Sequence, residues 1–232
     1  MATRRLGGIA AASSVPDNGG DHSGGGGSGD PDFANVSLLL DGDAEPITDL
    51  TGKSNIETLP PARVSTSKKK YGTGSLDVTG NGYLKTSTAD SFDVGGVFTV
   101  EFWVNYSDVA GNQTLINTNP PNQLYIAYTA GKIWVANLGK NVFSPLHTPV
   151  VNQWYHYAVV CDGSTYKLYV DGQLLDSSFD YIGSKVIDWW AVGARQSGLN
   201  QGNCFIDDLR ITKGIARYTG NFTPPTEALP KY

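Results

Sequence analysis

Carboxylates are the first side chains in this sequence that could do chemistry, because a retaining glycosidase needs two of them facing one cleft. Such a pair lies about 5–5.5 Å apart, so on a single strand both residues would occupy the same face. Glu101 has no acidic residue two or four positions further along. Asp207 and Asp208 are consecutive, so in a strand they point to opposite faces. No single strand therefore supplies an acid pair, and a glycosidase would need a pair formed across strands.

Other common catalytic patterns are missing from the sequence. It has no Gly-x-Ser-x-Gly nucleophile elbow and no His/Cys set with zinc-ligand spacing. His156 lies between two tyrosines in a strand-like run, where a structural role is favoured. The run 24–27 is all glycine but opens no helix, so it is a linker and not a phosphate-binding loop. We therefore predict a non-enzymatic protein without catalytic residues.

Asp207 is the carboxylate whose position needs an explanation. Strict alternation places it on one face with three apolar residues, Phe205, Leu209 and Ile211. That face should be buried, and an unpaired buried charge is expensive. We expect compensation by backbone N–H donors from a turn, or by an arginine such as Arg210 or Arg217.

A sugar-binding surface would combine aromatic rings, which stack on the apolar faces of sugars, with polar side chains that orient hydroxyl groups. Trp189 and Trp190 are consecutive, so only one of them should face the core. Polar residues crowd the loop 195–203, although an ordinary polar loop is the alternative. The predicted glycan-binding residues are Trp190, Arg195, Gln196, Asn200 and Asn203. Trp103 and Trp134 are expected in the core.

The composition favours strands and turns. Of 232 residues, 28 are glycine, 12 are tyrosine and 5 are tryptophan, and only 17% are charged. The net charge of −5 gives no basic field for nucleic acid or an anionic membrane. No apolar run approaches the ~20 residues that span a bilayer. Cys161 and Cys204 are expected to be free thiols in strands.

The first 33 residues cannot form a core. Asn18–Asp30 is rich in glycine and serine and behaves as a flexible tether. Such a segment cannot hold one conformation against its own entropy, so we expect a partner surface to bind it. The residues able to anchor it are Arg4, Arg5, Leu6 and Ile9. The same start also resembles a weak signal peptide, which keeps secretion as an alternative.

From Val36 onward, short apolar runs are separated by turn signals. Phe98–Tyr106 alternates strictly between apolar and other residues. Asn81-Gly82 suits a type I′ turn that would pair the runs on either side as a hairpin. About a dozen such strands and no helix-period run predict one antiparallel sandwich or barrel over residues 34–232, preceded by an extended arm over residues 1–33.

Several motifs, in this order, resemble those of concanavalin A-like, laminin G-like modules: Gly74–Val78 with Gly82–Leu84, Phe98–Val104, Trp154–Ala158, Leu168–Gly172 and Ile206–Ile211. The resemblance covers roughly residues 36–225 and implies an all-β, antiparallel jelly-roll sandwich. It is specific for the fold and unspecific for the ligand. Many modules of this fold carry a structural Ca²⁺, which would be a third way to compensate Asp207, with Asp43, Asp77 and Asp41 as weaker ligand candidates.

The closing segment Thr212–Tyr218, with Phe222–Pro225, is similar to the end of such modules in bacteriophage virion and tail proteins. The start, Met1–Gly8, looks like the short anchors of small virion proteins. Together they imply a virion structural protein, such as a decoration, fibre or tail accessory protein. It would dock on other virion proteins through residues 1–32 and display a lectin-like domain toward host-surface glycans. A free or secreted carbohydrate-binding module and a glycoside hydrolase are the alternatives, and the oligomeric state stays open.

Overall fold

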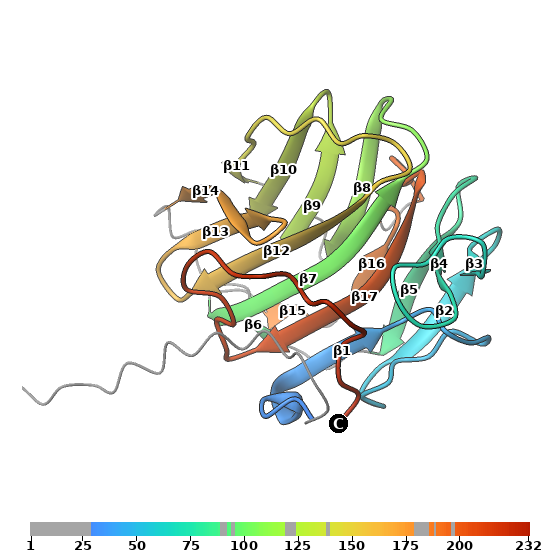
Figure 1. Cartoon of the computed structure of the whole chain (residues 1–232), viewed down its shortest axis with the longest axis horizontal. Coiled ribbons are helices and arrows are strands. Elements are labelled where there is room, and N and C mark those ends of the chain that lie inside the picture. Colours follow the sequence, from blue (N-terminus) through green and yellow to red (C-terminus); the bar gives the residue numbers. More distant parts are fainter. Residues whose placement is uncertain are drawn as a thin grey trace, which may run out of the picture.

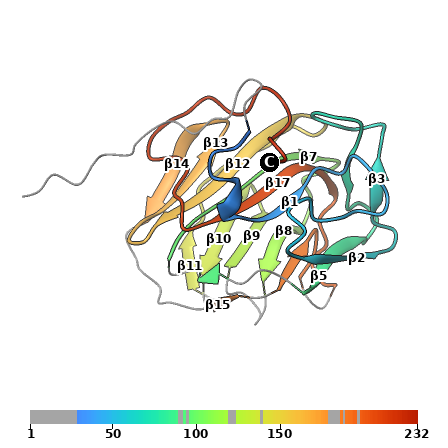
Figure 2. The same cartoon turned by 90° about the horizontal axis from the view of Figure 1, so that it is seen from below.

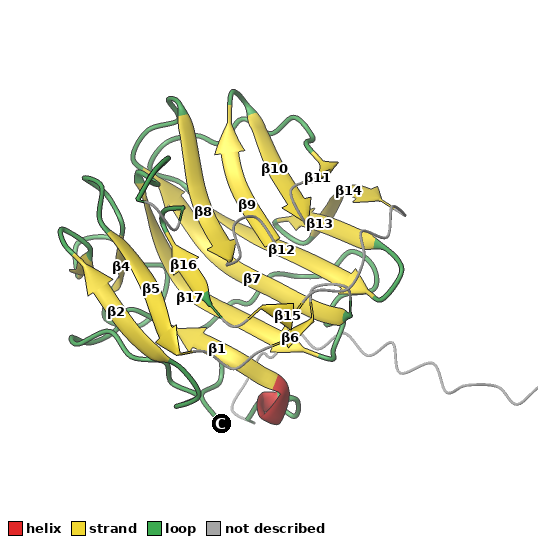
Figure 3. Ribbon diagram, turned by 180° about the vertical axis from the view of Figure 1, so that it is seen from behind, coloured by secondary structure: helices red, strands yellow, loops and turns green. Residues whose placement is uncertain are grey.

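The chain folds as an almost entirely β-stranded sandwich of two sheets (Figure 1). The computed structural model describes residues 29–88, 92–93, 96–118, 124–137, 140–178, 186–187, 189–195 and 198–232. Its single helical element is a 3-10 turn, η1 (Phe33–Asn35), so no helix in these residues is long and apolar enough to cross a membrane (Figure 3). The predicted anchoring residues Arg4, Arg5, Leu6 and Ile9 lie outside the described residues.

The first sheet, sheet A, has eight antiparallel strands. Along it the order is β14-β13-β12-β7-β17-β4-β3, and β1 also pairs with β17. Its members are β1 (Val36–Leu40), β3 (Arg63–Ser65), β4 (Ser75–Asp77), β7 (Val97–Tyr106), β12 (Trp154–Asp162), β13 (Tyr166–Val170), β14 (Gln173–Ser178) and β17 (Cys204–Lys213).

The second sheet, sheet B, has seven antiparallel strands in the order β11-β10-β9-β8-β16-β5-β2. Its members are β2 (Asn55–Leu59), β5 (Tyr83–Thr88), β8 (Asn112–Thr118), β9 (Leu124–Thr129), β10 (Lys132–Asn137), β11 (Lys140–Phe143) and β16 (Trp190–Val192). A small separate pair is formed by β6 (Phe92–Asp93) and β15 (Val186–Ile187). The predicted jelly-roll fold class is confirmed.

The core lies between the inner faces of the two sheets. On β7, Val100, Phe102 and Val104 are fully buried in it, as the alternation predicts. They meet inward residues of sheet B such as Ile126 and Val135. The other face of β7 carries polar residues, Glu101 among them, and it faces away from sheet B. Each sheet therefore has an outer face, and the two outer faces lie on opposite sides of the molecule.

A β-bulge in β17 changes the face that alternation predicts for Asp207. The register with β7 shifts between Asp207 and Arg210, and Asp208 has a left-handed φ of 46°. The extra residue lets both Ile206 and Leu209 face the core. Asp207 instead lies on the outer face, opposite Trp103 of β7. The prediction that Asp207 shares a face with Leu209 and Ile211 is therefore wrong.

A turn is present one residue earlier than the Asn81-Gly82 pair predicts, with Gly80 and Asn81 as its central residues, and it does not close a hairpin. Gly80 and Asn81 both have positive φ, 67° and 74°, which is the backbone of a type I′ turn. However, β4 pairs within sheet A and β5 pairs within sheet B. The turn carries the chain from one layer to the other. By contrast, residues 162–165 do close a hairpin, because β12 pairs with β13 on either side of them.

The segment 214–232, hereafter the tail, covers the outer face of sheet A without regular secondary structure (Figures 1 and 2). Tyr218 and Phe222 stack with ring centroids 3.5 Å apart and pack on Val160 and Tyr169. Leu229 packs on β1. The tail thus forms a third layer, and the part of this outer face that it covers, with Glu101, Val160 and Tyr169, is closed to solvent.

Candidate functional site

A buried ion network lies beneath the tail, on the outer face of sheet A. Arg210 donates from Nε and Nη2 to Glu101 Oε1 at 2.9 and 2.8 Å. Tyr218 donates from its hydroxyl to Glu101 Oε2 at 2.6 Å. His156 Nε2 lies 3.4 Å from the same oxygen. Burial alone would raise the pKa of Glu101, but the charge of Arg210 and the contact with His156 hold that pKa well below its ordinary value. Glu101 is therefore a permanently charged structural group.

Asp30 completes this network from the other end of the chain. Arg210 Nη1 and Arg217 Nη2 donate to Asp30 Oδ2 at 2.9 and 2.7 Å. Arg217 also donates to Asp30 Oδ1 at 3.1 Å. The Asp30 backbone N–H donates to the carbonyl of Tyr232 at 2.8 Å, so the two ends of the described chain meet here. Asp30 is buried. Residues 29–33, which the sequence assigns to the arm, thus pack on the domain.

Backbone donors compensate Asp207, the first of the three predicted ways. Its Oδ2 accepts from the N–H groups of Lys70 and Tyr71 at 2.7 and 3.1 Å, and its Oδ1 accepts from that of Asp208 at 2.9 Å. Burial nevertheless raises the pKa of Asp207 to about 7, helped by the neighbouring charge of Asp208. Arg210 and Arg217 are directed to Glu101 and Asp30 instead.

The other predicted calcium ligands have donors of their own. Asp77 pairs with Arg63 at 2.7 Å. Asp43 accepts from the backbone N–H groups of Thr73 and Gly74. Within the described ranges, no group of three or more His, Cys, Asp or Glu side chains could hold a metal ion. Asp207, Asp77 and Asp43 therefore do not form one site.

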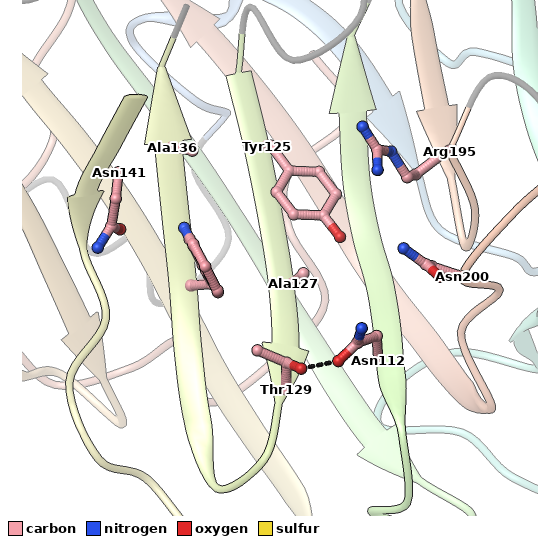
Figure 4. A pocket seen from close by; sticks show the side chains of 9 residues that line it. Asn112, Tyr125, Ala127, Thr129, Ala136, Asn141, Arg195 and Asn200 are labelled. Carbon is pink, nitrogen blue, oxygen red and sulfur yellow. Dashed lines mark hydrogen bonds between the residues drawn. The ribbon is translucent and has the colours of Figure 1, made fainter. Parts of the chain in front are cut away.

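A pocket of about 260 Å³ opens on the outer face of sheet B (Figure 4). Figure 2 shows that sheet B lies on the far side of the sandwich from the tail. Its lining contains two aromatic residues, Tyr125 and Trp134, and two alanines, Ala127 and Ala136. The other lining residues are polar: Asn112, Thr129, Asn141, Arg195 and Asn200. Trp134 is cross-strand partner to Ala127, and Tyr125 to Ala136. Each large ring thus stands opposite a methyl group. This alternation of large and small residues creates the hollow, and it leaves Trp134 39% exposed.

One side of the pocket rim, with Arg195 and Asn200, comes from the loop between β16 and β17. This loop is tied to β8 by backbone hydrogen bonds from Thr114 N to Asn200 O at 2.8 Å and from Gly193 N to Leu115 O at 2.9 Å. The Arg195 guanidinium carbon lies 5.5 Å from the Tyr125 ring centroid. In Figure 4, Arg195 and Asn200 lie on one side of the pocket and Asn141 on the other. The Thr129 hydroxyl donates to Asn112 at the lower edge.

A family model described as the concanavalin A-like lectin/glucanases superfamily, Laminin_G_3, matches residues 78–215. The chain belongs to this superfamily. No protein with a curated description matches the sequence.

Solved structures share the superfamily fold at low sequence identity. Domain 4 of AbnA, a GH43 extracellular arabinanase from Geobacillus stearothermophilus, was solved with arabinotriose; it is 17% identical with a TM-score of 0.61, over 78% of this chain and 93% of that one. The binding domain of botulinum neurotoxin serotype D/C is 13% identical with a TM-score of 0.59, over 78% of this chain and 49% of that one. The chain therefore spans about half the length of the neurotoxin binding domain. At these identities the likeness shows the fold alone.

Two predicted glycan-binding residues of this superfamily member line the pocket, Arg195 and Asn200. Gln196 lies outside the described residues. Asn203 does not line the pocket; its backbone N–H donates to Gln113 and its amide to Asp108. Trp190 is only 1% exposed and packs in the core, because β16 turns its residues 190 and 192 inward. Trp190 therefore cannot serve as a surface platform.

The pocket also contains aromatic residues that the sequence analysis missed. Trp134 was expected in the core, and that prediction is wrong, whereas Trp103 is buried beneath Lys70 and Tyr71. A usable signal existed for Trp134: it lies between Ile133 and Val135, both fully buried. Strict alternation through that run would have assigned Trp134 to the outer face. The same rule assigns Tyr125, which lies between the buried Leu124 and Ile126, to the outer face.

Proposed function

We propose that this chain is a non-enzymatic glycan-binding protein, and that the pocket on the outer face of sheet B is its binding site. The observation that carries the proposal is the pairing of two accessible rings, Trp134 and Tyr125, with the methyl groups of Ala127 and Ala136. Aromatic rings stack on the apolar faces of sugars, and the amides around the rim are suited to their hydroxyl groups. The complex of arabinotriose with a domain of the same fold supports a sugar as the ligand.

The lining favours binding over hydrolysis. A glycosidase needs two carboxyl groups at the sugar, and none of the nine described lining residues is acidic. Glu101 accepts hydrogen bonds from Arg210 beneath the tail, on the opposite outer face. Domain 4 of an arabinanase and about 31% of the chain of a Trypanosoma rangeli sialidase mutant share this fold, and hydrolysis is the alternative that activity assays would test.

The direct test is a glycan array probed with the whole chain. Binding to a defined set of oligosaccharides is expected, and Trp134→Ala should weaken it about tenfold or more, as for a central aromatic contact. Leu174→Ala is the matched control, because Leu174 is 47% exposed but lies on β14 of sheet A. No binding to any glycan on the array, or an equal loss of glycan affinity in Trp134→Ala and Leu174→Ala, would overturn the proposal.

We further propose that the chain is a component of a bacteriophage virion, held by the residues that precede Asp30. The similarity of its closing segment to phage modules supports this location. The geometry also suits it, because Asp30 lies on the outer face of sheet A and the pocket lies on the opposite side. A chain tethered through this end would present its pocket outward.

The virion proposal has its own test. The chain should co-sediment with intact virus particles, and deletion of residues 1–20 should abolish incorporation while the domain stays folded. Normal incorporation of the deleted chain would overturn this location without affecting the glycan-binding proposal.

A further inference from the structure

The pocket on sheet B is closed at one end, over strands β8 and β16. Residues directly opposite one another in antiparallel strands point to the same face of a sheet. Thr114 and Asn117 of β8 lie opposite the pocket residues Ala127 and Tyr125. Ala191 of β16 lies opposite Asn117. These three residues of β8 and β16 therefore belong to the outer face, yet all three are buried, so the outer face is covered at this point.

The other end of the pocket is open. Trp134 on β10 and Asn141 on β11 are both exposed. Asn141 lies opposite Ala136, so it points to the same outer face. Among the described strands, β11 is the last one of sheet B on this side. The pocket therefore reaches the edge of the sheet, and a long ligand has room to continue past Asn141 into solvent.

Arg195 and Tyr125 form a wall at the closed end. The loop that carries Arg195 is hydrogen-bonded to one edge of β8, and Tyr125 stands on β9 at the other edge. The Arg195 guanidinium carbon is 5.5 Å from the centre of the Tyr125 ring, so the two side chains together cross the outer face of β8. Figure 4 shows them pointing toward one another, with Asn200 beside them. The hydrogen bond from Thr129 to Asn112 bounds the pocket at its lower edge.

The geometry points to the end of a linear glycan chain as the ligand, an inference that rests on the proposed glycan-binding function. A chain that passed through the pocket across the strands would have to cross β8, where Arg195 and Tyr125 cover the outer face. A chain that ends at this wall avoids the obstruction. Its terminal sugar lies beside Tyr125 and Asn200, and the following sugars pass Trp134 and leave the sheet at Asn141.

The spacing of the strands sets the number of sugars that the pocket holds. The pocket runs across β9, β10 and β11, so its closed and open ends are two strand spacings apart, about 10 Å. One strand spacing is about 5 Å, close to the length of one sugar ring with its linkage. The terminal sugar then lies over β9, the second over β10, and the third over β11 beside Asn141. Contacts with the protein end at the third sugar.

The deciding experiment compares chain ends with internal sugars. Linear arabino-, gluco-, manno- and N-acetylglucosamine oligosaccharides, from the monosaccharide to the hexasaccharide, identify the sugar. The matching polysaccharide is then the competitor, before and after limited endo-hydrolysis. At equal mass the hydrolysed sample should compete more strongly, in proportion to the ends created.

Equal or weaker competition by the hydrolysed sample would show binding to internal sugars. That result would overturn the inference and leave the proposed glycan-binding function intact. No binding to any of the oligosaccharides would overturn both. The two failures are therefore distinguishable.

The same oligosaccharides test the arrangement along the pocket. Affinity should rise up to the trisaccharide and change less than about twofold beyond it. Asn141→Ala should weaken binding of the trisaccharide about fivefold, as for one hydrogen bond, and that of the disaccharide less than about twofold. Asn200→Gly should weaken binding of both by a similar factor, since glycine keeps the φ of 52° accessible. Equal losses for both lengths in Asn141→Ala, or a monosaccharide that binds as tightly as the trisaccharide, would overturn the arrangement.

The control is Gln173→Ala, which removes an exposed amide from β14 of sheet A. It should leave the affinities for the disaccharide and the trisaccharide unchanged. A loss of trisaccharide affinity equal to that in Asn141→Ala would show that the position of the amide does not matter. That outcome would overturn the placement of the third sugar at Asn141.

Discussion

The two outer faces of this sandwich are both built from strands of alternating pattern, but one is covered by the tail and the other is open to solvent. On sheet A the outward residues Glu101 and Arg210 are charged, fully buried and covered by the tail. On sheet B the outward residues Tyr125 and Trp134 are neutral and reach solvent in a pocket. The difference shows that strand alternation decides which residues face outward. Whether they serve stability or binding depends on whether another segment covers them.

The energetic demands on the two faces also differ. A charge buried beneath the tail must keep every partner, because removing one partner leaves the other uncompensated in a dry environment. A ring or an amide at the edge of the pocket is already partly solvated, so its loss costs little stability. We therefore expect variants on the ion-network face to affect stability and variants on the pocket face to affect binding.

The largest effect is expected for Glu101→Gln. It leaves Arg210 with one charged partner, Asp30, and should lower the free energy of unfolding by about 3–5 kcal/mol. The control is Glu57→Gln on the outer face of sheet B, where Glu57 is 51% exposed and pairs with Lys85 at 3.0 Å. That change should cost at most about 1 kcal/mol. Urea denaturation of both variants gives the comparison, and equal losses would contradict it.

Asp30→Asn should have the next largest effect, about 2–3 kcal/mol, because it weakens charged hydrogen bonds from two buried arginines. Two truncations sharpen the test. Removing residues 1–28 should leave the denaturation midpoint nearly unchanged, whereas removing residues 1–33 should lower it at least as much as Asp30→Asn. Equal midpoints for the two truncations would show that Asp30 does not contribute to the domain.

Ala127→Leu tests the pocket face without removing any polar contact. The larger side chain grows into the hollow beside Trp134, so glycan affinity should fall about tenfold, or ~1.4 kcal/mol. The free energy of unfolding should change by less than about 1 kcal/mol, because the added carbons enter open space. Ala110→Leu, at an exposed position outside the pocket lining, is the matched control. Unchanged binding of Ala127→Leu, measured by calorimetry, would place the site elsewhere.

The sequence predicts the parts of the fold that depend on local pattern. The alternation in β7 and the β12–β13 hairpin follow from neighbouring residues, and both are present. Other features depend on contacts that no local pattern signals. The bulge at Asp208 moves Asp207 from the expected inner face to the outer face, while Leu209 and Ile211 stay in the core, and the bond from Arg210 to Asp30 spans 180 residues.

The candidate site is predictable to a similar extent. Arg195 and Asn200 stand out because polar residues cluster in their loop, and both line the pocket. Trp190 was misplaced because β16 is only three residues long, too short for alternation to fix which residue faces inward. The hollow itself depends on the cross-strand pairing of Trp134 with Ala127, and register between strands cannot be derived from one strand alone.

The last prediction concerns the pH dependence of stability, and Asp208 provides it. Burial raises the pKa of Asp208 from 3.8 to about 7. Between these two values the folded state binds a proton that the unfolded state has lost, so the free energy of unfolding falls as pH rises. Asp207, whose pKa is also raised to about 7, acts in the same direction. The pKa of Asp30 is lowered from 3.8, so Asp30 makes the free energy of unfolding rise with pH, in the range below 3.8.

Asp208→Asn isolates this contribution with little change in structure. Asparagine keeps an acceptor for the N–H of Leu229, now 3.0 Å away, and tolerates the positive φ at this position. Urea denaturation across this pH interval should therefore show a shallower decline than in the wild type, and a variant at least as stable near neutral pH. The decline should not vanish, because Asp207 keeps its share. A profile parallel to that of the wild type would contradict this prediction, because it would show that Asp208 is ionised in the folded state throughout the interval. Burial on the covered face would then not raise the pKa of Asp208.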